Sequence, residues 1–102
     1  MSQKEKTKFR ASSKWKKYRL SRKKEDKVDY ITNRPLLKGF NLHHLDLDEK
    51  HYCDITDDNN FECLNKQTHE FIHWLYRYYP NDPEILGRIK AMMDRMCDLN
   101  NH

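Results

Sequence analysis

The sequence lacks long hydrophobic runs and contains few cysteines. No apolar stretch among its 102 residues is long enough to cross a bilayer or to form the core of a signal peptide. The three cysteines, Cys53, Cys63 and Cys97, are odd in number and form no CxxC pair, which argues against a disulfide framework and against a four-thiolate zinc site. We therefore expect a soluble, intracellular protein with reduced thiols and no membrane partner.

Acidic residues are scarce at the beginning of the chain. From Met1 to Val28, twelve lysines and arginines accompany three acids, a balance of +9 that leaves −5 for the rest of a chain whose net charge is +4. Such a segment indicates a polyanionic partner such as DNA, although a solvated, partly disordered tail explains the same charge. We expect residues 1–11 to be a flexible basic arm. The candidate DNA-binding residues are Lys14, Lys16, Lys17, Arg19, Arg22, Lys23 and Lys24.

The first predicted helix begins at Ser12 or Ser13, either of which is a good N-cap. Its spacing places Trp15, Tyr18 and Arg22 on one side, with lysines elsewhere. The aromatic side chains are expected to stack on the body of the protein. The opposite, basic face is expected to meet solvent or a phosphate backbone.

Two short strands are predicted in the middle of the chain. Turn-forming residues in 31–39 lead into a strand at about 40–45, and an acidic loop follows it. A second short strand, 61–64, is a candidate to pair with the first in a hairpin. Two neighbouring residues of a strand point to opposite faces, so the adjacent histidines in 40–45 are expected to have different surroundings.

Two helices are predicted in the last third of the chain. The first begins after Asn65, a suitable N-cap, and ends at Pro80; the second begins with Asp82 as cap and Pro83 in its first turn. Apolar residues recur in the second helix at helical spacing, and we expect them to be core packing residues. These residues are Ile85, Leu86, Ile89, Met92, Met93 and Met96.

Four of the six histidines fall into two pairs. His69 and His73 are four residues apart and therefore lie about one turn apart on one helix face, a spacing that lets two imidazoles bind one cation. If the hairpin packs on this helix, one of His43 and His44 supplies a third ligand and the other points away. A neutral imidazole left without a metal is suited to removing a proton from water.

The order of these residues resembles the ββα-metal signature of the HNH endonuclease family. A histidine pair on a strand, a loop asparagine (Asn60) and a final pair of helical histidines occur here with the offsets of bacterial toxin DNases of the colicin type. The resemblance covers residues 39–75, and small phage-borne members are also similar in the flanking segments. It implies an α+β fold with a ββα-metal (His-Me finger) core at about 39–80, a basic N-terminal helix and a C-terminal amphipathic helix, within a single HNH domain at 12–102.

The resemblance also implies a role for each residue. His43, His69 and His73 would bind one divalent metal ion (Mg²⁺, Mn²⁺, Ni²⁺ or Zn²⁺), His44 would be the general base, and Asn60 would brace the loop and orient the His44 ring. The implied activity is metal-dependent hydrolysis of DNA phosphodiester bonds in the cytoplasm of a bacterial host cell, if the chain is phage-encoded.

The chain departs from the family pattern in one respect. Many members carry a zinc ribbon, with two thiols at the positions that Asn65 and Thr68 occupy here, so no structural zinc is expected. Asn65 is a rival candidate for the family asparagine, although its position suits a helix cap. Asp46 or Asp48 could add a ligand oxygen or hold a histidine N–H, and a polar strand edge explains both as well.

Two other functions stay open at this point. One is a noncatalytic DNA-binding or assembly module that keeps the ββα-metal fold. The other is a purely structural zinc site closed by all four histidines. The sequence also leaves open the physiological metal, the oligomeric state, a phosphate contact from Arg77, and a protein partner such as a phage packaging enzyme.

Overall fold

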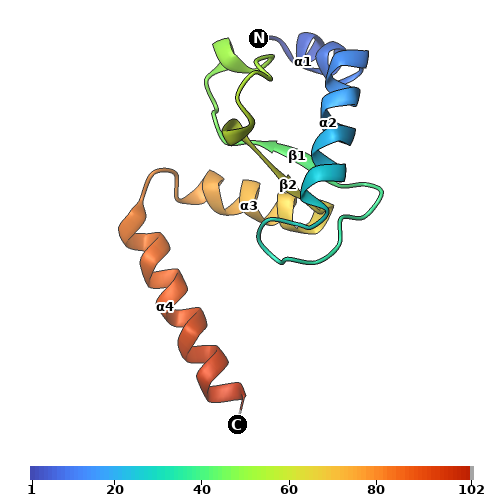
Figure 1. Cartoon of the computed structure of the whole chain (residues 1–102). Helices are drawn as coiled ribbons and strands as arrows, with labels where there is room; N and C mark the ends of the chain where they lie inside the picture. The colour runs from blue at the N-terminus through green and yellow to red at the C-terminus, as the bar shows by residue number, and fades with distance from the viewer. Residues whose placement is uncertain (102) are drawn as a thin grey trace. The chain divides into compact units, whose positions relative to one another are not determined.

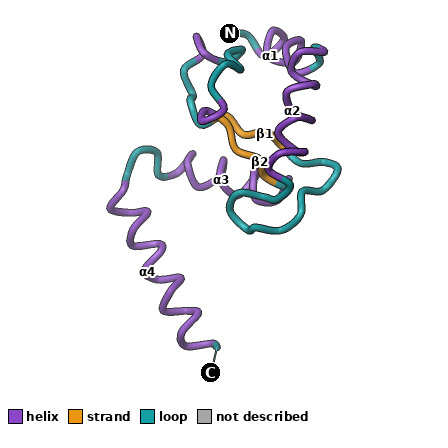
Figure 2. The backbone as a smooth tube through the Cα atoms, in the orientation of Figure 1, coloured by secondary structure: helices purple, strands orange, loops and turns teal. Residues whose placement is uncertain are grey.

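The computed structural model describes residues 1–101 and has a mixed α+β fold (Figures 1 and 2). Its helices and strands are α1 (Gln3–Arg10), α2 (Ser13–Asp26), β1 (Asn41–His44), β2 (Phe61–Leu64), α3 (Lys66–Tyr78) and α4 (Pro83–Asn100). Two short 3₁₀ helices, η1 (Glu49–His51) and η2 (Asp58–Asn60), lie in the loop that joins the strands. The expected α+β class is thus confirmed. Among the described helices, none is long and apolar enough to span a membrane.

The beginning of the chain differs from the expected flexible arm, because Gln3–Arg10 form helix α1. Ser2 and Glu5 form a capping box: the Ser2 hydroxyl accepts the Glu5 amide, and the Glu5 carboxylate accepts the Ser2 amide. This pair satisfies two amides at the helix start that would otherwise lack partners. Phe9 then packs against the core, so α1 gains tertiary support that its low apolar content did not indicate.

Helix α2 begins and faces inward as the sequence predicted. The Ser12 side chain accepts the Trp15 amide at the N-cap, and the helix ends at Lys27, which adopts a left-handed conformation with φ of 64°. Trp15 and Arg22 are its buried residues, and Tyr18 packs against the core beside them. The predicted side of the helix is therefore the side that it buries.

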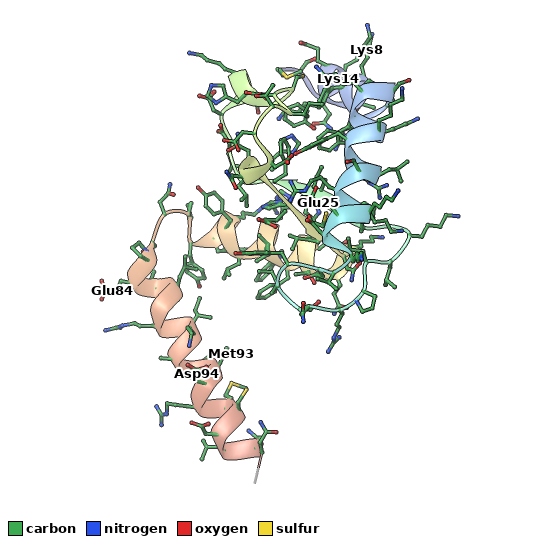
Figure 3. The ribbon with its side chains drawn as sticks, viewed as in Figure 1. Lys8, Lys14, Glu25, Glu84, Met93 and Asp94 are labelled. Atoms are coloured by element: carbon green, nitrogen blue, oxygen red, sulfur yellow. The ribbon has the colours of Figure 1, made fainter. Side chains whose placement is uncertain are left out.

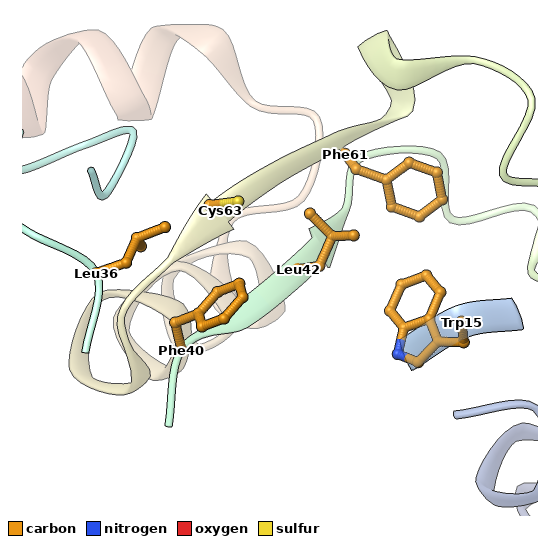
Figure 4. Close-up of a cluster of buried hydrophobic side chains, with 6 residues drawn as sticks. All are labelled: Trp15, Leu36, Phe40, Leu42, Phe61 and Cys63. Atoms are coloured by element: carbon orange, nitrogen blue, oxygen red, sulfur yellow. The ribbon is translucent and has the colours of Figure 1, made fainter. Parts of the chain in front are cut away.

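The two strands form an antiparallel pair, which confirms the predicted hairpin. His43 lies opposite Glu62, and His44 lies opposite Phe61. The face of this sheet that is turned to α2 carries the core (Figure 4). Its buried members are Trp15, Leu36, Phe40, Leu42, Phe61 and Cys63.

A buried carboxylate ties the connection after α2 to the start of α3. Asp29 is fully buried and accepts backbone N–H groups from Ile31 and Thr32, which shape its own turn, and from Asn65 at 2.7 Å. Burial raises the pKa of Asp29, but the hydrogen bonds from Thr32, Asn65 and Thr68 outweigh it and hold the pKa below its ordinary value. Asp29 thereby fixes the residue that immediately precedes α3.

Asn65 stands at the predicted start of α3 but uses its side chain differently. The helix begins at Lys66, as expected, and the Asn65 carbonyl accepts the His69 amide. The side-chain amide instead accepts the Leu37 N–H at 2.8 Å and donates to the Pro35 carbonyl at 3.1 Å. Asn65 therefore joins α3 to the loop before β1 and does not act as the predicted side-chain cap.

The chain divides into two compact units, where the sequence suggested one domain over residues 12–102. The first unit is Met1–His69, and the second begins at Glu70, inside helix α3. Helix α4 starts as predicted, with Asp82 accepting the Ile85 amide and a proline in the first turn. However, none of its residues is buried, and its methionines are about half exposed. Their packing in a core stays a prediction.

Candidate metal centre

The histidine pair of β1 is divided between two environments. His43 is only 9% exposed, and its ring lies 5.1 Å from the ring of His69, measured between centroids. His44 is half-buried and stacks instead on Trp15 of α2. Alternation along the strand produces this division, as the sequence predicted.

His69 and His73 complete the cluster on the His43 side. The boundary between the two compact units falls inside α3, which is one uninterrupted helix, so helical geometry alone sets His73 about one turn from His69. One possible ligand nitrogen from each of His43, His69 and His73 lies within 4.8 Å of the other two. The three predicted metal ligands are therefore brought together.

The spacing and chemistry of these nitrogens fit one divalent cation. Because zinc–nitrogen bonds are about 2.0–2.1 Å long, two imidazoles on one tetrahedral ion have nitrogens roughly 3.3 Å apart. Nitrogens within 4.8 Å reach that separation by small rotations of the side chains. Among residues 1–101, His44 does not belong to this group, so the four-histidine structural site is not formed.

His44 is held in a slot between aromatic rings. The Tyr52 ring stacks on it at 4.5 Å with 7° between planes, and Trp15 stacks at 5.4 Å with 15° between planes. Phe61, its partner on β2, contacts it edge-on at 4.9 Å. These three contacts restrict rotation of the imidazole about both side-chain bonds.

A single carbonyl sets the tautomer of His44. Its Nε2 lies 3.1 Å from the Tyr52 carbonyl oxygen, and because a carbonyl can only accept, Nε2 carries the proton and Nδ1 carries the lone pair. Burial lowers the pKa of His44, the bond to Tyr52 raises it, and the charges of Arg10 and Lys6 lower it further. The net direction is downward, so the ring is neutral at neutral pH.

The role of Asn60 in orienting the His44 ring, which the family resemblance implied, stays a prediction. Within the described residues, the hydrogen bonds of Asn60 run through its backbone: its N–H donates to the Asp57 carbonyl, and its carbonyl accepts the Leu45 N–H at 2.8 Å. The second bond closes the end of the hairpin just after His44. Asn60 thus braces the loop, while Tyr52 orients the ring.

Helix α1 supports Tyr52 from the far side of the slot. Phe9 contacts the Tyr52 ring edge-on at 5.8 Å, and the Lys6 ammonium lies 5.1 Å above it. Lys6 also pairs with Glu49 of η1 at 2.6 Å, and the amino group of Met1 pairs with the same carboxylate. Sequence reasoning missed Tyr52 because nothing in an acidic, turn-rich loop distinguishes one aromatic residue. The serine and glutamate of the capping box were the available signal for α1.

Arg22 cannot contact DNA as predicted, because it is buried and paired. It is 6% exposed, and its guanidinium binds the Asp26 carboxylate at 3.0 Å. It also donates to the carbonyls of Asp58 at 2.8 Å and Phe61 at 3.0 Å. Arg22 therefore connects α2 to the second strand and to the loop before it.

The other predicted DNA contacts divide into two groups. Arg19 packs over the Phe40 ring at 3.9 Å and donates to the Phe40 carbonyl, and Lys23 lies above the same ring at 5.5 Å. Their charges are partly engaged in packing. The exposed members are Lys14, Lys16, Lys17 and Lys24.

Side chains of the acidic loop after His44 form hydrogen bonds with other residues of the same loop. Asp46 accepts the Asp48 amide and binds the His51 ring at 2.7 Å, which raises the pKa of His51. Among the described residues, the group able to share a metal consists of the three histidines, and neither aspartate belongs to it. The two aspartates therefore have a structural use within the loop.

Comparison of this chain with protein-family models, with curated proteins and with solved structures finds no match.

Proposed function

We propose that the protein is a metal-dependent endonuclease that hydrolyses DNA phosphodiester bonds. The observation that carries this proposal is the convergence of one strand imidazole and two helical imidazoles, His43, His69 and His73, with their nitrogens within 4.8 Å. The adjacent His44 is excluded from that group and restrained separately. A purely structural metal site has no need of a restrained imidazole beside it. The HNH resemblance of the sequence points to the same chemistry and to a ββα-metal core.

A divalent cation bound by the three histidines would stabilise the charge that develops on the phosphate and on the leaving 3′ oxygen. His44 would take a proton from the attacking water at Nδ1, because Nε2 donates to Tyr52. The slot formed by Trp15 and Tyr52 keeps that nitrogen in one direction. An all-imidazole donor set suits Ni²⁺ and Zn²⁺ better than Mg²⁺.

DNA binding is assigned to the exposed lysines of α2. They face solvent, and an ammonium on a flexible stem contacts phosphate without reading bases. We therefore expect binding with little sequence preference and with strong dependence on salt. The residues concerned are Lys14, Lys16, Lys17 and Lys24.

The test is nicking of supercoiled plasmid by the purified full chain with Mg²⁺, Mn²⁺, Ni²⁺ or Zn²⁺. We expect nicking that EDTA abolishes and that His44→Ala lowers by roughly 10²- to 10⁴-fold, the usual contribution of a general base. His51→Ala is the matched control, because His51 is exposed and lies outside the metal group, and it should keep full activity. Both variants should still bind DNA.

Three outcomes would change the proposal. Equal nicking by His44→Ala and wild type would remove His44 from the mechanism. Retained DNA binding without nicking in any metal would favour a noncatalytic DNA-binding or assembly module. Loss of metal binding in His44→Ala, measured by calorimetry, would instead favour a closed structural site.

A further inference from the structure

The direction in which α3 leaves β2 decides whether His69 meets His43. Only Asn65 separates the last residue of β2 from the first residue of α3, and the loop of residues 27–40 passes beside this junction (Figures 1 and 3). His69 lies one turn further along α3, so a change of roughly 20° in the helix direction at Asn65 displaces its backbone by about 2 Å. A cation would then have to draw the helix back, at a cost in affinity.

The carboxylate of Asp29 holds this junction. Asp29 has no exposed surface, and its Oδ2 accepts the Asn65 N–H at 2.7 Å. The Thr68 hydroxyl, in the first turn of α3, donates to the same carboxylate. The other oxygen, Oδ1, accepts the N–H groups of Ile31 and Thr32 at 2.8 and 2.9 Å. The side chain therefore joins its own turn to the beginning of the helix.

The turn that carries Asp29 is attached to β2 as well. The Tyr30 N–H donates to the Cys63 carbonyl in the strand at 3.0 Å. Within the turn, the Asp29 N–H donates to the Arg34 carbonyl at 2.8 Å. Asn33 adopts a left-handed conformation with φ of 58° and donates its N–H to the Asp29 carbonyl at 2.9 Å. One short turn thus holds the strand through Tyr30 and the helix through Asp29.

His69 is connected to this junction through the backbone. The Asn65 carbonyl accepts the His69 N–H at 2.9 Å, and Thr68 is the residue immediately before His69. The His69 ring lies 5.1 Å from the ring of His43, measured between centroids. Asp29, the junction and both rings belong to the same compact unit, Met1–His69. The bonds to Asp29 therefore bear directly on the distance between the two imidazoles.

We propose that Asp29 is a positioning residue of the metal centre, which fixes the start of α3 against β2 so that His69 faces His43 before a cation binds. The inference rests on the metal centre of the proposed function and assigns it a supporting group that touches neither metal nor substrate. Hydrogen bonds to a charged acceptor are stronger than those between neutral groups, and Asp29 receives four of them. A site ordered in advance binds without the cost of ordering the helix.

The experiment measures Ni²⁺ binding to the full chain by calorimetry, without DNA. Thr68→Val keeps the shape of the side chain but removes the hydroxyl, and it should raise the dissociation constant for Ni²⁺ roughly 10-fold, the lower end of the range for groups that support metal ligands. Thr68→Ser keeps the hydroxyl and should bind Ni²⁺ as the wild type does. Asp29→Asn has one acceptor oxygen fewer and should raise the constant by up to roughly 100-fold. Circular dichroism shows whether Asp29→Asn keeps its fold, and Thr68→Val decides the question if it does not.

Arg22→Met is the control for a general loss of stability. It removes the donor to the carbonyls of Asp58 and Phe61, at the end of β2 away from Asn65. Below its melting temperature it should bind Ni²⁺ with the affinity of the wild type. A positioning role therefore predicts that affinity follows the bonds to Asp29 and does not follow the melting temperature.

Wild-type affinity in Thr68→Val and in folded Asp29→Asn would overturn the positioning role and leave the proposed nuclease intact. Equal losses in Thr68→Val and Thr68→Ser, or a loss in Arg22→Met that matches its fall in melting temperature, would also overturn it. A wild-type chain that binds no Ni²⁺ would overturn the positioning role together with the metal centre. The expected affinities in a chain that never nicks plasmid would refute the nuclease and support the role of Asp29.

Discussion

Replacement of Arg22 by methionine separates a structural role from a DNA-binding one. Methionine keeps much of the packed stem but leaves the carbonyls of Asp58 and Phe61 without their donor, and it removes the partner of Asp26. A buried carbonyl that loses its hydrogen bond costs about 1–3 kcal/mol. This applies to the Phe61 carbonyl, whereas the bond to Asp58 is only partly buried. Removal of one member of a buried ion pair costs about 3–5 kcal/mol, and Asp26 is less buried than Arg22.

We therefore expect Arg22→Met to lower the free energy of unfolding by about 3–5 kcal/mol, a large share of the 5–15 kcal/mol typical of a small domain. At roughly 4–8 °C per kcal/mol for a small domain, the melting temperature should fall by about 12 °C or more. Tryptophan fluorescence reports on this loss of stability, because Trp15 is buried in the core on the same helix as Arg22, whereas Trp74 is exposed. Lys24→Met is the matched control on the exposed side of α2 and should change stability by less than about 0.5 kcal/mol.

The effects of the two variants on DNA binding should be the reverse of their effects on stability. Below both melting temperatures, Arg22→Met should keep the affinity and salt dependence of the wild type. Lys24→Met should reduce the slope of log affinity against log salt by about 0.9, the value for one lost phosphate contact. If Arg22→Met melts with the wild type and binds DNA with a reduced slope, its guanidinium is a surface group and the structural reasoning fails.

Two further predictions concern Cys63 and Tyr52. Burial raises the pKa of the Cys63 thiol from 9.0 to about 12, so its thiolate at pH 8 is about 1,000-fold scarcer than at the ordinary pKa. Iodoacetamide should therefore label exposed Cys53 before Cys63. Equal labelling rates, measured by mass spectrometry, would contradict the burial of Cys63. Tyr52→Leu should lower the nicking rate at saturating DNA by roughly 10- to 100-fold with little change in KM, because His44 loses a stacking partner. The control Tyr30→Leu, at an exposed position, should match the wild type. Equal nicking rates of Tyr52→Leu and wild type would remove the Tyr52 ring from the mechanism.

The parts of the fold that depend on local pattern were predictable. Trp15 and Tyr18 revealed the inner side of α2 by their spacing, and the strand positions of His43 and His44 gave them different neighbours. These features depend on periods of 3.6 and 2 residues, which a sequence displays directly. To predict that His69 meets the strand required one further assumption, that the hairpin packs on the helix.

The parts that depend on long-range contacts were not predictable. Arg22 was placed with the DNA-binding residues because its spacing does not reveal that two carbonyls, 36 and 39 residues further along, would accept its protons. Asp29 received no role at all, although it is fully buried. Such residues are fixed by the partner that the fold brings to them, and composition cannot supply that partner.

The prediction for helix α4 is a different case. Its apolar period was detected correctly, but a period shows only that one face of a helix is covered and does not identify what covers it. A core inside the same chain was the simplest assumption, and no residue of α4 is buried among the described residues.

The basic N-terminal segment therefore combines the proposed DNA-binding role with a structural one, and charge alone would not separate the two. Its exposed lysines suit a phosphate backbone, but Phe9, Lys6 and Trp15 also form or support the slot that holds His44. Deletion of α1 would remove positive charge and release Tyr52 at the same time, so a loss of nicking after such a deletion could not be assigned to DNA affinity. Point variants of the exposed lysines change charge without touching the slot, and Tyr52→Leu changes the slot without touching charge. A weaker complex should follow from the first and a slower reaction from the second, which makes the two contributions measurable independently.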